Sequence, residues 1–124
     1  MKQKILIIED NEPNLYLLTF LMEKEGYVVS AARNGQEGFE MACRIKPDMI
    51  LLDIELPVMD GYSVVRELRK TSDFADTPIV AVTSYVMIGD REKAIEAGCN
   101  GYIEKPINPK KFLGQVEQYF TGKY

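Results

Sequence analysis

The chain has 124 residues, of which 46% are hydrophobic and 27% charged. These proportions are those of one ordinary globular domain, and they exclude a disordered, collagen-like or coiled-coil chain. Fifteen lysines and arginines stand against 19 acidic residues, and the net charge of −4 argues against binding to duplex nucleic acid. Histidine is absent from the sequence, so any chemistry has to use carboxylates, hydroxyls and lysines.

Five short apolar runs alternate with five longer segments of helical periodicity. Apolar runs of four or five residues without polar alternation are typical of parallel strands buried on both faces. The expected strands are Lys4–Ile8, Tyr27–Ala31, Met49–Leu52, Ile79–Val82 and Gly101–Ile103, and the expected helices are Asn11–Glu25, Gly35–Ile45, Gly61–Lys70, Gly89–Ala97 and Pro109–Phe120. The alternation predicts an α/β fold, a flavodoxin-like (βα)5 doubly wound sandwich whose parallel five-stranded sheet has the order 2-1-3-4-5.

Cysteine usage and the N-terminal segment favour a cytoplasmic protein. Cys43 and Cys99 lack a Cys-x-x-Cys spacing, and we expect both to be small buried side chains in a reducing compartment. The first apolar run, Ile5–Ile8, is too short for a signal peptide or a membrane span. We therefore expect a protein with no membrane partner.

Acidic residues follow the first and third expected strands. The predicted strand order makes these two strands neighbours, so Glu9 and Asp10 would meet Asp53 in the crevice at the carboxyl ends of the sheet. Converging carboxylates repel a bare phosphate and repel each other unless a cation lies between them. A hard divalent ion that keeps several waters suits such oxygens, and Mg²⁺ fits better than Ca²⁺ or zinc.

The first acidic loop also permits a purely structural interpretation. Asp10 or Asn11 is a suitable N-cap for the following helix, and the residues alone leave both roles open. Asp53 has no capping role, because the next helix begins near Gly61. Asp60 and Gly61 themselves are interpreted as turn chemistry that leads into that helix.

A hydroxyl and an ammonium group complete the predicted crevice. Thr83 follows the fourth expected strand and Lys105 follows the fifth. Carboxylates, a hydroxyl and a lysine on four strand ends can hold a metal, accept a phosphoryl group and neutralise its oxygens.

These motifs carry a family resemblance. The sequence resembles the receiver domain of two-component response regulators over essentially its whole length, in particular stand-alone receivers similar to bacterial cell-division and polarity regulators, or the receivers of hybrid kinases. The matching residues are, in chain order, Glu9-Asp10, Asp53, Pro57, Asp60-Gly61, Thr83 and Lys105-Pro106. The resemblance implies one receiver domain over residues 1–124, without an output domain.

The resemblance implies a role for each acidic residue. Asp53 would be the phosphoacceptor, with a histidine kinase or histidine phosphotransfer protein as the donor. Asp10 and Asp53 would ligate Mg²⁺, Glu9 would act through water or an outer contact, and Glu55 would offer its backbone carbonyl. Lys105 would pair with Asp53 at rest and with a phosphoryl oxygen afterwards.

The resemblance also implies a switch. Thr83 would move toward the phosphoryl group, and Tyr102 would fill the space it leaves; the alternative for Tyr102 is a half-buried ring on an edge strand. The surface of helix 4, strand 5 and helix 5 would then bind a downstream protein effector, with Arg91 and Lys110 on it. The molecule would be a monomer or weak dimer and not an enzyme, apart from its own phosphorylation and dephosphorylation.

Two accessory positions and three rival classes complete these expectations. Tyr85 is expected to shield the phosphoryl group and lengthen its life, and the bond from Lys105 to Pro106 is expected to be cis.

One rival is a pseudo-receiver, which keeps the fold and binds protein without accepting phosphate. A second is a Mg²⁺-dependent nuclease or topoisomerase-primase-like domain, suggested by Asp53-Ile54-Glu55 and disfavoured by the net charge. Flavodoxin is disfavoured because the acidic first loop would repel its cofactor's phosphate.

Overall fold

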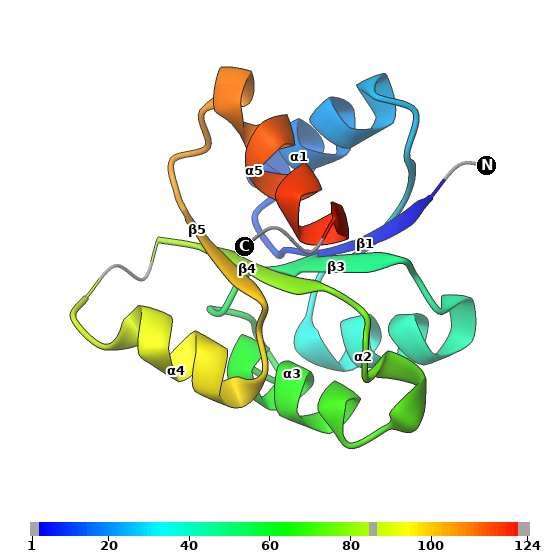
Figure 1. Cartoon of the computed structure of the whole chain (residues 1–124), viewed down its shortest axis with the longest axis vertical. Coiled ribbons are helices and arrows are strands. Elements are labelled where there is room, and N and C mark those ends of the chain that lie inside the picture. Colours follow the sequence, from blue (N-terminus) through cyan, green and yellow to red (C-terminus); the bar gives the residue numbers. More distant parts are fainter. Residues whose placement is uncertain (1–2, 85–86, 122–124) are drawn as a thin grey trace.

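The protein is a three-layer sandwich with a parallel sheet between two layers of helices (Figure 1). The computed structural model describes residues 3–84 and 87–121. The strands are β1 (Lys4–Ile8), β2 (Val28–Ala32), β3 (Met49–Leu52), β4 (Ile79–Thr83) and β5 (Gly101–Glu104). The helices are α1 (Glu12–Lys24), α2 (Gly35–Ile45), α3 (Gly61–Arg69), the short 3-10 helix η1 (Ser72–Phe74), α4 (Asp90–Ala97) and α5 (Pro109–Thr121).

The sheet has the order β2-β1-β3-β4-β5, which confirms the predicted flavodoxin-like topology. Helices α1 and α5 cover one face, and α2, α3 and α4 cover the other (Figure 1). The winding direction reverses between β1 and β3, so the loops that follow these two strands lie next to each other.

Each face of the sheet has its own apolar core. Strand β1 shows how one sequence supplies both, because successive side chains of a strand point to opposite faces. Ile5 and Ile7 belong to the core beneath α1 and α5, and Leu6 and Ile8 belong to the core beneath the other three helices. All four side chains are fully buried, as expected for a central parallel strand.

Several element boundaries differ from the predicted ones by one residue. Strand β2 begins at Val28 and not at Tyr27, whose ring stacks on Phe120 of α5 with centroids 5.5 Å apart. Strands β4 and β5 each run one residue further than predicted, to Thr83 and Glu104, which are paired in the sheet. The last side chain of the strand is polar in both cases, so the apolar pattern underestimates the length of the strand.

Polar side chains fix the start of three helices. Asn11, Asn34 and Asp60 accept hydrogen bonds from the backbone N–H three residues later, at 3.0, 2.8 and 3.1 Å. Each bond satisfies a backbone donor that the helix itself leaves unpaired. The structural role predicted for Asp60 is confirmed, and Asn11, not Asp10, caps α1.

The prediction that both cysteines are buried is correct for Cys99 and wrong for Cys43. Cys99 is buried, but Cys43 is exposed on α2. The neighbouring Ala42 is buried in the core, and successive helical residues are about 100° apart, so Cys43 is turned away from the sheet. Within the part of the chain that the structure describes, none of the helices has the length and apolar character to cross a membrane.

Candidate functional site

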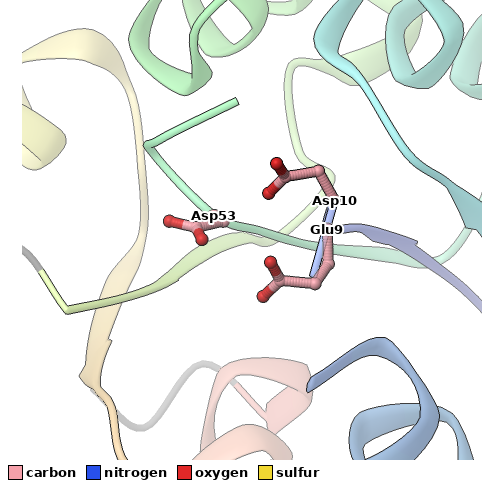
Figure 2. Close-up of side chains that lie close together, drawn as sticks. All are labelled: Glu9, Asp10 and Asp53. Carbon is pink, nitrogen blue, oxygen red and sulfur yellow. The ribbon is translucent and has the colours of Figure 1, made fainter. Parts of the chain in front are cut away.

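Three carboxylates converge at the carboxyl ends of β1 and β3. Ile8 pairs with Leu52 in the sheet, and the backbone N–H of Asp53 donates to the carbonyl of Ile8 at 3.0 Å, so the residues after the two strands are held side by side. One oxygen each of Glu9, Asp10 and Asp53 lies within 4.8 Å of the others. Figure 2 shows the three side chains extending toward the same space. The cluster predicted from the strand order is therefore present.

Lys105 binds two of these carboxylates. Its Nζ donates to Glu9 Oε1 at 2.5 Å and to Asp53 Oδ2 at 2.9 Å. The side chain of Lys105 is 10% exposed, that of Glu9 1% and that of Asp53 8%. One ammonium is thus shared by two buried carboxylates, and it compensates one of their two negative charges.

Burial and ion pairing act on the pKa values of this cluster in opposite directions. Burial raises the pKa of Glu9 above its usual value, although the hydrogen bond from Lys105 acts to lower it. Burial acts to lower the pKa of Lys105, but its hydrogen bonds to Glu9 and Asp53 outweigh this effect, and the pKa is raised. Lys105 is therefore a permanent cation at neutral pH, which suits the neutralisation of anionic oxygens.

Backbone donors fix the other oxygens of the two buried acids. The N–H of Glu55 donates to Asp53 Oδ1 at 3.0 Å, and the N–H of Asn11 donates to Glu9 Oε2 at 3.2 Å. These donors have no signature in the sequence, because every residue except proline carries a backbone N–H. They hold both carboxylates in one orientation before any ligand binds.

Asp10 differs from the two buried acids because it is exposed. Since Asn11 takes the cap position, the carboxylate of Asp10 is available for another role. Asp10 and Glu55 also line a cavity of about 590 Å³ that extends to Arg66, whose guanidinium carbon lies 5.9 Å from the ring centre of Tyr62. Tyr62 and Arg66 are four residues apart on α3, and neither is among the site residues expected from the sequence.

The donor set suits a hard divalent cation. All the candidate ligands are oxygens, and three carboxylates offer one oxygen each within a space that a single ion can bridge. Mg²⁺ prefers one or two protein carboxylates and retained waters, and the exposed Asp10 leaves room for those waters. The residues present therefore fit Mg²⁺, and the Glu55 carbonyl as a further ligand stays a prediction.

Thr83 ends β4, and Tyr102 lies on the adjacent strand β5, opposite Ala81 and thus two residues before Thr83 in the register. Thr83 is fully buried, and the ring of Tyr102 is 8% exposed. The half-buried alternative for Tyr102 is therefore wrong: the side chain belongs to the core that also includes Ala94 and Ala97 of α4. The Tyr102 hydroxyl is buried without a hydrogen-bond partner among the described residues, and burial raises its pKa to about 12.

The remaining predicted residues lie at the edge of the site or outside the structure described. Pro106 is exposed and follows a cis peptide bond, as expected. Arg91 and Lys110 are exposed on α4 and α5. Tyr85 falls outside the described residues, so its shielding role stays a prediction.

This doubly wound sheet, which gathers paired acids, a buried aspartate and the ammonium of a lysine at its carboxyl edge, has the architecture of a receiver module. The family model for the response regulator receiver domain matches residues 5–117, and the chain belongs to this family. Receiver domains in general bind Mg²⁺ at an acidic pocket and interact with histidine kinases or phosphotransfer proteins.

The curated relatives include response regulators that the chain matches over nearly their whole length. It is 38% identical to the polar-differentiation response regulator DivK of Brucella anthropi over 119 residues, which are 96% of this chain and 97% of that protein. The DivK protein of Brucella ovis is 37% identical over the same share of both chains.

Solved structures agree with this assignment. The chemotaxis response regulator CheY4 of Vibrio cholerae has a TM-score of 0.91 at 26% identity, covering 96% of this chain and 99% of that one. The receiver domain of the sensor histidine kinase PA1611 from Pseudomonas aeruginosa has a TM-score of 0.89 at 34% identity, covering 98% and 99%. That structure has a magnesium ion coordinated in the active-site cleft.

Proposed function

We propose that the protein is a phosphoacceptor switch in a two-component phosphorelay, in which Asp53 accepts a phosphoryl group from a histidine kinase or histidine phosphotransfer protein. The observation that carries the proposal is the position of Asp53, which is buried at the strand end, accepts a hydrogen bond from the Lys105 ammonium and lies beside the carboxylates of Glu9 and Asp10. The chain has no histidine, so a histidine donor has to belong to another molecule.

The residues of the site have complementary roles in this transfer. Glu9, Asp10, Asp53 and the Glu55 carbonyl would hold Mg²⁺, which when bound neutralises charge on the phosphoryl oxygens. An oxygen of Asp53 attacks phosphorus, the bond from phosphorus to the donor nitrogen breaks, and the donor imidazole leaves. Lys105 transfers its interaction to a phosphoryl oxygen, since its ammonium already lies at Asp53.

The signal would leave through a protein-binding surface. Phosphorylation adds about −1.5 to −2 charges and new acceptor oxygens next to Thr83. A movement of Thr83 toward these oxygens would alter the packing around Tyr102, and thereby the surface of α4, β5 and α5, which bears Arg91 and Lys110. The similarity to DivK, a polar-differentiation response regulator, supports a regulatory role. In this proposal the protein is cytoplasmic, acts on a protein effector and is not an enzyme on other substrates.

Intact-mass spectrometry tests the proposal. The protein is incubated with Mg²⁺ and a small phosphoryl donor such as phosphoramidate, and we expect an acid-stable, base-labile phosphoryl adduct. Asp53→Asn removes the acceptor and should abolish the adduct. Asp48→Asn is a matched control, because Asp48 accepts a hydrogen bond from the backbone of Lys4 at the opposite end of the sheet. An unmodified parent protein, or an undiminished adduct in Asp53→Asn, would contradict the proposal; the first result would favour a pseudo-receiver.

A further inference from the structure

The turn between β2 and α2 contacts both loops that carry the candidate metal ligands. On one side, the carbonyl of Ala32 accepts a hydrogen bond of 3.0 Å from the N–H of Glu9, the first residue of the acidic loop. On the other side, the N–H of Gly35 donates to the carbonyl of Pro57 in the β3–α3 loop, residues 53–60, at 3.3 Å. Residues 32–35 offer no ligand themselves, yet they connect the two halves of the site.

Gly35 is required by a close backbone approach. A Cβ added at this position would lie 1.7 Å from the carbonyl oxygen of Met59 and 2.6 Å from its carbonyl carbon. These are backbone atoms, which cannot rotate away as the end of a side chain can. Any larger residue at position 35 therefore has to displace the β3–α3 loop.

The β3–α3 loop has little freedom to absorb such a displacement. At its far end, Gly61 donates to the carbonyl of Ile54 at 2.9 Å, and a Cβ at Gly61 would lie 2.6 Å from the Cα of Ile54. Val58 stands between Pro57 and Met59, the two residues that lie against Gly35, and has a φ of 71°. A β-branched residue in this conformation is strained, and such strain persists only where the surroundings enforce it.

We propose that Gly35 is a positioning residue for the Mg²⁺ site: its contact with Met59 and Pro57 sets the path of the β3–α3 loop and thereby the position of Glu55. This inference rests on the proposed function, because it assumes that the acids and the Glu55 carbonyl hold Mg²⁺. Mg²⁺ demands near-ideal octahedral geometry, whereas Ca²⁺ accepts longer and more variable bonds. A displaced loop should therefore weaken Mg²⁺ binding more than Ca²⁺ binding.

Calorimetric titration of two variants tests the inference. We expect Gly35→Ala to lower the affinity for Mg²⁺ about tenfold or more and to lower the affinity for Ca²⁺ less. Gly38→Ala is the matched control: it lies in the same helix, and the three atoms nearest to its Cβ would all be side-chain atoms of Ile8, the nearest at 2.5 Å. Gly38→Ala should lose stability but keep the Mg²⁺ affinity and the preference between the two metals. Equal losses for both metals in Gly35→Ala, or no loss, would overturn the inference.

A measurement on the unmutated protein covers the case in which Gly35→Ala fails to fold. Hydrogen exchange of the Gly35 N–H should slow about tenfold or more when Mg²⁺ saturates the site, because a metal that requires this contact also stabilises it. The N–H of Asp48, bonded to the carbonyl of Lys4 at 2.7 Å at the other end of the sheet, is the reference. A Gly35 N–H whose exchange changes no more than that of Asp48 would overturn the inference. A parent protein that does not bind Mg²⁺ would instead overturn the proposed function.

Discussion

The ammonium group of Lys105 donates a 2.9 Å hydrogen bond to Oδ2 of Asp53, 52 residues away in the sequence. The same ammonium bonds Glu9, so a single cation holds two buried carboxylates together. Asp53, the proposed acceptor, therefore already has a counter-charge before a metal or a phosphoryl group arrives.

Replacement of this lysine should have opposite effects on metal binding and on phosphorylation. In Lys105→Met two buried carboxylates lose their cation, and we expect the free energy of unfolding without metal to fall by about 3 kcal/mol. Mg²⁺ should bind about tenfold more tightly, because a repelling charge is gone. Phosphorylation of Asp53 should slow strongly.

Urea unfolding, calorimetric titration and intact mass measure these three effects. Lys70→Met is the matched control, because Lys70 pairs with Glu67 on the exposed surface of the α3 end and should change none of them. Weaker Mg²⁺ binding in Lys105→Met would contradict the electrostatic argument.

A pair of neighbouring substitutions separates the metal ligand from the helix cap. Asp10→Asn should weaken Mg²⁺ binding by about tenfold or more with little effect on folding, since Asp10 is exposed. Asn11→Ala removes the cap of α1 and should lower the free energy of unfolding by about 1 kcal/mol without a comparable loss of Mg²⁺ affinity. Calorimetric titration and urea unfolding of both variants check the assignment. A loss of stability in Asp10→Asn together with a loss of Mg²⁺ affinity in Asn11→Ala would show that Asp10 has the structural role.

Tyr102→Phe should stabilise the unphosphorylated protein at neutral pH. The substitution removes a buried hydroxyl that has no hydrogen-bond partner among the described residues, and we expect a gain of about 1 kcal/mol in the free energy of unfolding. Urea unfolding at pH 7 measures the gain. A loss of similar size would mean that the hydroxyl makes a favourable contact.

The raised pKa of Tyr102 predicts that the free energy of unfolding depends on pH above neutrality. Its pKa in the folded protein is about 12, above the usual value of 10, so the folded state keeps the phenol proton that the unfolded chain releases. The stability that depends on this proton is fully present below pH 10 and is lost as the pH rises toward 12. Relative to Tyr102→Phe, the parent should lose about 1.4 kcal/mol by pH 11. Parallel curves of unfolding free energy against pH for the two proteins would refute this expectation.

Stability at the opposite end of the sheet depends on Arg69. Its guanidinium donates to the carbonyls of Gly98 and Thr77 at 3.0 and 2.9 Å, and to Asn100 Oδ1 at 2.7 Å, which ties α3 to the segments before β4 and β5. Arg69→Met should lower the free energy of unfolding by about 2 kcal/mol, because three half-buried acceptors lose a charged donor. Phosphorylation of Asp53 in the folded protein should be unchanged, and a large change would indicate coupling between the two ends of the sheet.

The sequence by itself determined the fold and the residues that make up the site. Apolar runs and helical periodicity are local patterns, and the rules of parallel sheets convert them into a strand order. Because the carboxyl ends of parallel strands share one edge, that order brings Glu9, Asp10, Asp53 and Lys105 together, as the structure shows.

Only the tertiary structure decided the finer arrangement. Whether Asp10 or Asn11 caps α1, whether Tyr102 is buried, and whether Lys105 reaches Glu9 as well as Asp53 depend on side chains packed from distant segments. The contact of Gly35 with Met59 depends on two backbones that approach each other between separate loops. Local sequence patterns encode which face a residue presents, but the distance between two such segments is set only when the whole chain packs.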